Sequence, residues 1–261
     1  DKKIISIGDP LKRFSEDPVR SLRAIRFSNK LNFKIDKNIK DAIYKKGHLL
    51  SNISNARIFD EFCKMFLNGL GEKNFKKLVS FGLNKYLLIT SHNESDISKK
   101  LINEALRNTD SRVKNNQSVT PGFLIAAMLW PELLKRSSKN REINLRKYFR
   151  SMDQILRSQQ KITAIPRKFH TYIKDIWVLQ LKLHSRIGKQ PYKTVNHPRF
   201  RAAYDFLLVR ERACDCKGVL GDWWTKFQKN DRIQQKSLIA ELKDFNDKES
   251  HKKFGFTEEL I

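Results

Sequence analysis

Apolar residues recur at helical spacing along most of the chain. The first stripe, at Val19, Leu22 and Ile25, predicts a helix that runs to about residue 32. We expect it to begin at Pro18 with the Asp17 side chain as N-cap, because aspartate accepts hydrogen bonds from free N–H groups and proline needs no partner there. The same periodicity predicts helices over residues 38–52, 55–69, 72–89, 95–116, 122–134 and 197–212.

The residues between these stripes are typical of helix ends. Ser54 is expected to cap the helix that follows it, and Gly82 to end a later one. Pro121 opens the most apolar segment, GFLIAAMLWPELL, which is too short to span a membrane and predicts a buried core helix. Alternation indicates a strand only in KKIISIG, residues 2–8. The pattern therefore predicts an all-α fold with one short strand.

The charge balance determines what such a helical protein is expected to bind. The chain has 53 Lys and Arg against 28 Asp and Glu, a formal net charge of +25. This charge implies a polyanionic partner, and nucleic acid fits better than an anionic membrane surface because phosphate contacts release counterions. The sequence has no apolar run of about 18 residues and no signal peptide. We therefore expect no membrane span and a soluble, cytoplasmic protein.

No complete active site is visible in the sequence. The 3 Cys and 6 His show neither a CxxC pair nor the spacing of a zinc site, so free thiols are expected and no metal ligand or catalytic residue is assigned. Walker A, GxGxxG, GxSxG and HExxH motifs are missing, as is a Gly-Ser followed by a D-x-D pair. Either the protein only binds, or it is the later part of an enzyme whose catalytic domain lies upstream.

Basic residues gather in two stretches that also contain aromatic residues. Residues 131–170 hold 11 Lys and Arg against 3 acids, with Tyr148, Phe149 and Phe169 among them. Cations pair with phosphates and rings stack on bases, so we interpret this stretch as RNA-binding, although any single ring has an alternative role in a helix core. A second cluster lies around the helix at 197–212. The candidate RNA-binding residues are Arg146, Lys147, Arg150, Arg167, Lys168, Arg199 and Arg201.

Several segments resemble one enzyme family. IGDPLKRFSEDPVRSLRAIRFSNKLNFKID is similar to the neck entry of the tRNA nucleotidyltransferase and poly(A) polymerase family, where E-D-x-x-R starts a helix after the catalytic head. ISNARIFDEFCKMFLNG resembles the following conserved helix, with Arg57 and Glu61 at its recurring Arg and Glu. ALRNTDSRV, TPGFLIAAMLW, DIWVLQLKL and GKQPYKTVNHPRFRAAYDFLLVR resemble bacterial poly(A) polymerases rather than CCA-adding enzymes, and the similarity extends to about Lys229.

The resemblance implies an enzyme that adds AMP from ATP to RNA 3' ends without a template. In the family, head carboxylates hold two Mg²⁺ ions. None of them is matched here, so the chain is expected to lack the head and to be inactive alone. The implied fold is all-α, with elongated neck and body domains. The implied ranges are 1–8 for a remnant strand of the head, 9–112 for the neck, 113–229 for the RNA-binding body and 230–261 for a C-terminal tail.

The same resemblance gives the E-D-x-x-R motif a role in base recognition. In the family its Asp and Arg stand in for a template base, which implies this role for Asp17 and Arg20. A carboxylate accepts from the N6 amino group of adenine, and a guanidinium donates to N1. Cytosine offers the same two groups, so this pair excludes G and U but does not separate ATP from CTP.

Four more arginines accompany this pair. Arg23 and Arg26 are interpreted as charges near the triphosphate or an acidic head, and Arg13 and Arg57 as supports of the pair. Pairing of these arginines with neighbouring acids is an equally open interpretation. Glu16, the first residue of the motif, completes the predicted nucleotide-binding set.

Three functions compete on the sequence alone. The first is the C-terminal portion of a poly(A) polymerase. The second is a portion of a CCA-adding enzyme, which the neck permits and the distal segments disfavour. The third is a non-catalytic RNA-binding protein. The expected partners are RNA 3' ends and ATP, with Mg²⁺ only where the head is present, and the protein is expected to be a monomer.

Overall fold

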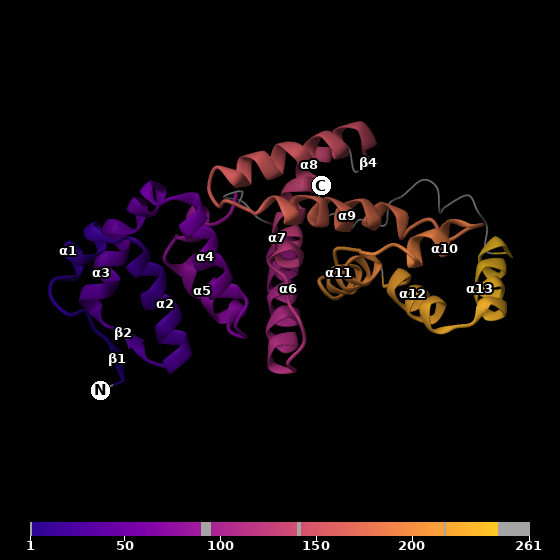
Figure 1. The fold of residues 1–261 in the computed structure, drawn as a ribbon. Helices are drawn as coiled ribbons and strands as arrows, with labels where there is room; N and C mark the ends of the chain where they lie inside the picture. The colour runs from indigo at the N-terminus through magenta and orange to yellow at the C-terminus, as the bar shows by residue number, and fades with distance from the viewer. Residues whose placement is uncertain (1, 90–94, 140–141, 217, 245–261) are drawn as a thin grey trace. The chain divides into compact units, whose positions relative to one another are not determined.

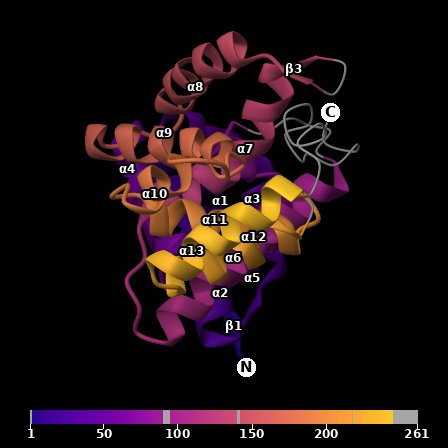
Figure 2. The ribbon, with the colours of Figure 1, turned by 90° about the vertical axis from the view of Figure 1, so that its right-hand side faces the viewer.

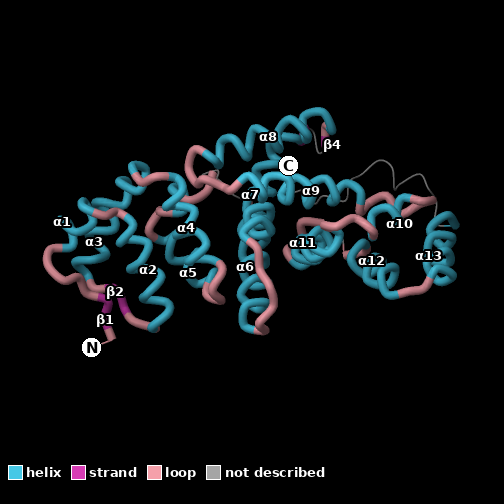
Figure 3. The backbone as a smooth tube through the Cα atoms, viewed as in Figure 1, coloured by secondary structure: helices cyan, strands magenta, loops and turns pink. Residues whose placement is uncertain are grey.

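Helices account for most of the structure, a computed structural model that describes residues 2–89, 95–139, 142–216 and 218–244 (Figure 1, Figure 3). The α-helices are α1 (Pro10–Glu16), α2 (Val19–Leu31), α3 (Lys37–Lys46), α4 (Asn55–Phe66), α5 (Gly71–Ser80), α6 (Asp96–Lys114), α7 (Pro121–Ser137), α8 (Leu145–Gln160), α9 (Arg167–Lys182), α10 (Gln190–Val195), α11 (Phe200–Arg212), α12 (Leu220–Lys229) and α13 (Arg232–Asp244). The short elements are the 3-10 helices η1 (Gly47–Asn52) and η2 (Asn84–Tyr86) and the strands β1 (Lys3–Ile4), β2 (Lys34–Ile35), β3 (Ser138–Lys139) and β4 (Glu142–Ile143). The predicted all-α class is confirmed.

The strands form two short ladders. β1 pairs in parallel with β2, and β3 pairs antiparallel with β4. The strand predicted over residues 2–8 is mostly wrong, because β1 ends at Ile4, and Ile5 and Ile7 are 72% and 92% exposed. Its partner strand ends where the Asp36 carboxylate accepts the Asn38 N–H and starts α3, so β1 has nothing further to pair with there.

Helix capping differs from the prediction in the first 32 residues. The Asp9 carboxylate caps α1, accepting N–H bonds at 3.0 and 3.3 Å, and Pro10 occupies the first turn. α2 begins at Val19, and no backbone N–H among the described residues donates to the Asp17 carboxylate. The predicted Asp17 side-chain cap is therefore wrong, because this carboxylate bonds to a distant arginine instead. Asn32, with φ 54°, ends the helix as expected.

The chain divides into two compact units that are each discontinuous in sequence. One contains residues 1–92, 106–121 and 156–166, and the other contains residues 93–105, 122–155 and 167–261. Helices α6 and α8 contribute residues to both. The functional boundary near residue 112 stays a prediction.

The first unit packs α2 against α4 and α5. The predicted stripe at Val19, Leu22 and Ile25 is fully buried, and Phe62 and Phe66 of α4 pack edge to face at 4.9 Å. α5 ends at Ser80, and Gly82 takes φ +67°, a conformation that costs glycine little. Ser54 precedes α4, but its side chain makes no capping bond.

The second unit is built around α7. As predicted, its segment from Leu124 to Trp130 is buried, and the helix continues through Pro131. Trp223 and Trp224, which the sequence favours as packing anchors, are both buried in α12. The Trp224 indole N–H donates to the Leu183 carbonyl at 2.9 Å.

Residues 232–244, which lie in the segment predicted to be a C-terminal tail, form α13. This helix lies in front of α12 in Figure 2, and its Ile239 is buried in the same apolar cluster as Trp223 and Trp224. The last part of the predicted C-terminal tail, residues 246–261, lies outside the described residues.

Candidate functional site

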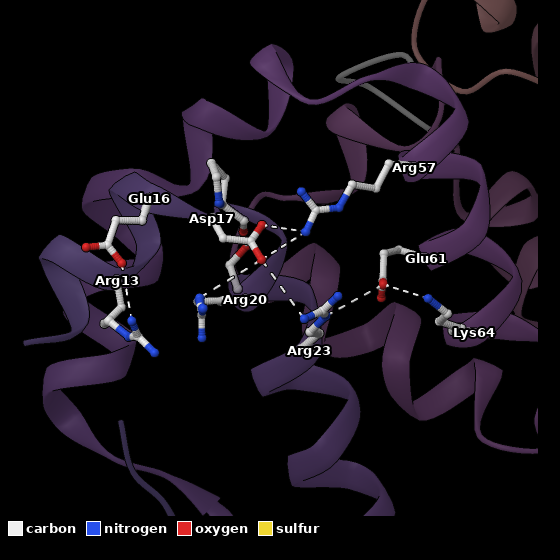
Figure 4. Close-up of polar contacts among 10 residues, drawn as sticks. Arg13, Glu16, Asp17, Arg20, Arg23, Arg57, Glu61 and Lys64 are labelled. Atoms are coloured by element: carbon white, nitrogen blue, oxygen red, sulfur yellow. Dashed lines mark hydrogen bonds and ion pairs between the residues drawn. The ribbon is translucent and has the colours of Figure 1, made fainter. Parts of the chain in front are cut away.

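A chain of alternating charges links the start of α2 to one side of α4 (Figure 4). We refer to it as the Asp17 cluster, and its members are Asp17, Arg20, Arg23, Arg57, Glu61 and Lys64. All six lie in the first unit.

The strongest contact in the cluster joins residues 40 positions apart. Arg57 Nη2 donates to Asp17 Oδ1 at 2.8 Å and to Asp17 Oδ2 at 2.9 Å. A hydrogen bond between charged groups is shorter and stronger than a neutral one. Asp17 is half-buried between α1 and α2, so Arg57 fixes the direction in which this carboxylate points.

Two further guanidinium groups surround the same carboxylate. Arg20 Nε and Arg23 Nη1 each lie 4.0 Å from Asp17 Oδ2. Arg20 Nε is buried without a hydrogen-bond partner among the described residues. Three cations around one carboxylate leave a positive excess, and the Arg20 side chain is 37% exposed.

Glu61 anchors the other end of the cluster. It is 1% exposed, and its Oε1 lies 3.1 Å from Lys64 Nζ and 3.7 Å from Arg23 Nε. A buried carboxylate needs a cationic partner, so Glu61 constrains Arg23. The predicted site did not include Glu61, although its position four residues after Arg57 places both on one face of α4.

The other predicted nucleotide-binding residues are not held by this cluster. Arg13 pairs with Glu16 along α1 at 3.3 Å, and both side chains are exposed. Arg26 places its guanidinium carbon 4.5 Å from the centre of the Phe27 ring. Pairing with a neighbouring acid therefore holds for Arg13, and support of Asp17 holds for Arg57. A nucleotide-binding role for these residues stays a prediction.

The candidate RNA-binding residues all lie in the second unit, where α8 carries three of them. Arg146, Lys147 and Arg150 are exposed, and none has an acidic partner among the residues that the structure describes. Arg167 and Lys168 are exposed in the first turn of α9. This part of the surface has uncompensated positive charge.

The candidates near α11 contact aromatic rings. The Arg199 guanidinium lies 4.9 Å from the Tyr172 ring centre, and the Arg201 guanidinium lies 5.7 Å from that of Tyr204. Arg201 also pairs with Asp205 at 3.1 Å. The positive charge of Arg201 is therefore partly compensated, unlike that of the cations of α8.

Arg210 belongs to the same basic cluster by sequence, but its side chain does not lie on the surface. Its side chain is fully buried, with its Nε bonded to Asp215 and its Nη1 donating to Gln180 at 3.0 Å. Trp130 donates to the same Asp215 oxygen at 3.1 Å. Burial alone would lower the pKa of Arg210, but the Asp215 charge raises it overall, so the Arg210 guanidinium stays charged. Arg210 therefore organises the core and does not reach a ligand.

The aromatic rings of residues 131–170 also differ in how far they are buried. Tyr148 is buried in the core, where its hydroxyl donates to the Trp177 carbonyl at 2.8 Å. Phe149 is 46% exposed, and Phe169 is half-buried with Lys168 Nζ 5.2 Å from its ring centre.

The thiols of Cys63 and Cys216 are uncharged at neutral pH. Cys63, Cys214 and Cys216 are free thiols, as predicted. Burial, followed by the Asp60 charge, raises the pKa of Cys63 to about 11, and burial raises the pKa of Cys216 to about 12.

The described residues contain no metal site and no membrane span. Within them, no three His, Cys, Asp or Glu side chains meet in a group that could hold a metal ion. None of the described helices combines the length and apolar character that crossing a bilayer requires.

Comparison with known proteins identifies two matching family models. One, described as "Polymerase A arginine-rich C-terminus", matches residues 141–254, and one described as "Probable RNA and SrmB- binding site of polymerase A" matches residues 32–91. The chain is 35% identical to Poly(A) polymerase I of Salmonella typhi over 91% of its length and 54% of that protein. It is 34% identical to Poly(A) polymerase I of Haemophilus influenzae over 96% of its length and 58% of that protein. The chain thus spans about half the length of these relatives.

CCA-adding enzymes match a smaller part of the chain. The CCA-adding enzyme of Anoxybacillus flavithermus is 42% identical over 84 residues, which is 32% of this chain and 21% of that protein. The similarity to poly(A) polymerases covers almost three times as much of the chain as this one does.

Proposed function

This chain belongs to the bacterial poly(A) polymerase family, and on that premise we propose that it supplies nucleotide-base recognition and RNA binding to an enzyme that adds AMP from ATP to RNA 3' ends without a template. The similarity along about nine-tenths of the chain is the observation that carries this proposal. CCA addition has weaker support, because those relatives match only a third of the chain.

The proposal assigns chemistry and recognition to different parts of the whole protein. We expect the catalytic carboxylates and their Mg²⁺ ions in the part of these relatives that the chain does not span, which is somewhat less than half of their length. Residues 9–112 would then recognise the base, and residues 113–229 would bind RNA. The 261-residue chain alone is expected to transfer no nucleotide. We expect the whole enzyme to act as a cytoplasmic monomer on RNA.

The Asp17 cluster suits adenine recognition. Asp17 has two oxygens with about four lone-pair directions, so it can accept from the adenine N6 amino group while it remains bonded to Arg57. The Arg20 side chain is 37% exposed, so its terminal N–H groups would donate to adenine N1. Arg57 and Glu61 act as positioning residues, since they fix Asp17 and Arg23. The geometry of the head would then select ATP over CTP.

The basic residues of the second unit suit a single-stranded RNA. Arg146, Lys147 and Arg150 present charge without an acidic partner among the described residues, and phosphate neutralisation by such groups drives binding without base readout. The residues 32–91 would add a further RNA contact or a protein contact, in line with the description of the family model that they match.

The test of base recognition uses the full-length polymerase. Arg20→Ala removes the donor to adenine N1, a charged hydrogen bond worth about 1.5–3 kcal/mol, so kcat/KM for ATP should fall about tenfold to a hundredfold. Asp17→Asn should also lower kcat/KM for ATP, because the amide has one acceptor oxygen fewer for the adenine N6 amino group. Incorporation of ATP, CTP, GTP and UTP is measured for each variant, together with Tm and RNA affinity.

Folding controls make this test decisive. Both variants should melt near the wild-type Tm and bind RNA normally, because neither removes apolar burial or a phosphate contact. Wild-type ATP selectivity in both folded variants would leave the motif with a structural role only.

A further inference from the structure

Phe149 differs from the other aromatic residue of α8, Tyr148, in its exposure. Its side chain is 46% exposed, whereas the adjacent Tyr148 is fully buried. Arg146 lies one helical turn before Phe149 on the same side of α8, and Arg150 follows it directly. Both arginines are exposed. An apolar ring is therefore exposed to solvent near two cations.

The ring of Phe149 is held by its buried neighbour. The Tyr148 and Phe149 ring planes are nearly perpendicular, at 89°, with their centres 5.9 Å apart. Tyr148 is itself fixed by its 2.8 Å hydrogen bond to the Trp177 carbonyl and by an edge contact with Trp130. A ring that is already ordered loses less conformational entropy when a flat ligand stacks on it.

Resting on the RNA-binding role proposed above, we propose that Phe149 is a base-stacking platform for single-stranded RNA, with Arg146 and Arg150 contacting phosphates next to the stacked base. Every base has a π-face, so such a platform accepts any sequence. In a duplex the faces of the bases are already stacked, so the site selects unpaired RNA. The cationic flanks favour a polyanion over an apolar protein surface.

The test compares an RNA with a base-free polyanion. For the 261-residue chain, Kd is measured for a 20-nucleotide oligo(A) and for inorganic polyphosphate of similar charge. Stacking of one base on an aromatic ring contributes about 1–3 kcal/mol, and a ring that is about half exposed corresponds to the lower end. Phe149→Ala should therefore weaken oligo(A) binding about fivefold to twentyfold and leave polyphosphate binding unchanged.

Matched variants separate the ring from its apolar area. Phe149→Trp should bind oligo(A) at least as well as the wild type, and Phe149→Leu should behave like Phe149→Ala. Leu145→Ala is the control, because Leu145 is 48% exposed one turn earlier on α8 and has no ring. It should leave both affinities unchanged. Circular dichroism and Tm confirm that each variant is folded.

Each other outcome overturns the stacking role in a distinguishable way. Wild-type oligo(A) affinity in Phe149→Ala, with a loss in Arg146→Gln, would overturn stacking and leave RNA binding intact. Equal losses of affinity for oligo(A) and polyphosphate in Phe149→Ala would show that the ring only stabilises the helix. If Phe149→Ala lowered the affinity only for vesicles of anionic phospholipid, this face of α8 would be a membrane contact. No RNA binding by the wild-type chain would overturn both proposals.

Discussion

The Asp17 cluster and the outer face of α8 are both rich in basic residues, yet they differ in how those residues are paired. In the cluster, Asp17 and Glu61 hold Arg23, Arg57 and Lys64 within ion-pair distance. On α8, the exposed Arg146, Lys147 and Arg150 form no ion pair with an acid among the described residues. Paired cations hold a fixed geometry suited to one base, whereas unpaired cations exchange counterions and suit a flexible polyanion.

A third arrangement, at Arg210, shows that charge count does not identify a binding surface. Arg210 and Asp215 are both fully buried and bonded to each other.

The largest effect is expected from breaking the buried pair. Asp215→Ala leaves the Arg210 charge buried without its partner, which typically costs about 3–5 kcal/mol of unfolding free energy. Urea denaturation followed by circular dichroism measures this loss. Asp205→Ala is the matched control, because Asp205 pairs with the exposed Arg201, and it should cost less than about 1 kcal/mol. Equal losses in the two variants would contradict the assignment of Arg210 to the core.

The next largest effect concerns the unpaired cations of α8. Replacing Arg146, Lys147 and Arg150 with Gln should reduce the slope of log Kobs for single-stranded RNA against log salt by about 2, because each phosphate that is no longer neutralised lowers the slope by about 0.7. The unfolding free energy should change little. The control replaces Lys99, Lys226 and Lys236, which are exposed and lie in the same unit, and so removes the same charge. If both triple variants show the same reduction in slope, net charge and not this face governs binding.

A smaller effect is expected from loosening the Asp17 cluster. Arg57→Ala removes the bonds of 2.8 and 2.9 Å that orient Asp17, so kcat/KM for ATP in the full-length enzyme should fall about tenfold. RNA affinity should stay the same. Arg107→Ala serves as the control, since Arg107 lies in the same unit and pairs with Glu72, which is not a member of the cluster. An unchanged kcat/KM for ATP in Arg57→Ala would show that Arg57 does not position Asp17.

The smallest effect is the pH dependence of a surface pair in the first unit. Burial would raise the pKa of Glu72, but Lys76 and Arg107 lower it overall from 4.5. A lowered folded-state pKa adds stability that is present above about pH 4.5 and is lost as the pH falls through the lowered value. Glu72→Gln should remove this dependence, at a cost below about 1 kcal/mol at neutral pH. The Tm of the wild type and of Glu72→Gln is measured from pH 6 to 3. Parallel curves of Tm against pH would refute a stabilising role for the pairing of Glu72.

Local periodicity was sufficient to predict most helices. The stripe at Val19, Leu22 and Ile25, the buried segment after Pro121 and the helix end before Gly82 all depend on side-chain spacing or on the conformation of one residue. The same local reasoning failed at Asp17. Its carboxylate had two competing partners, and the distant Arg57 outcompetes the adjacent N–H groups.

The sequence by itself determined the helical class, the E-D-x-x-R motif and the excess of positive charge. The tertiary structure alone decided which of these charges are paired, buried or available. Arg150 and Arg210 have the same chemistry and both lie on amphipathic helices, yet one is exposed and the other is enclosed beside Asp215. The reason is physical: helix formation depends on neighbours within a few residues, whereas the free energy of a charge depends on the water and the counter-charges that the whole fold places around it.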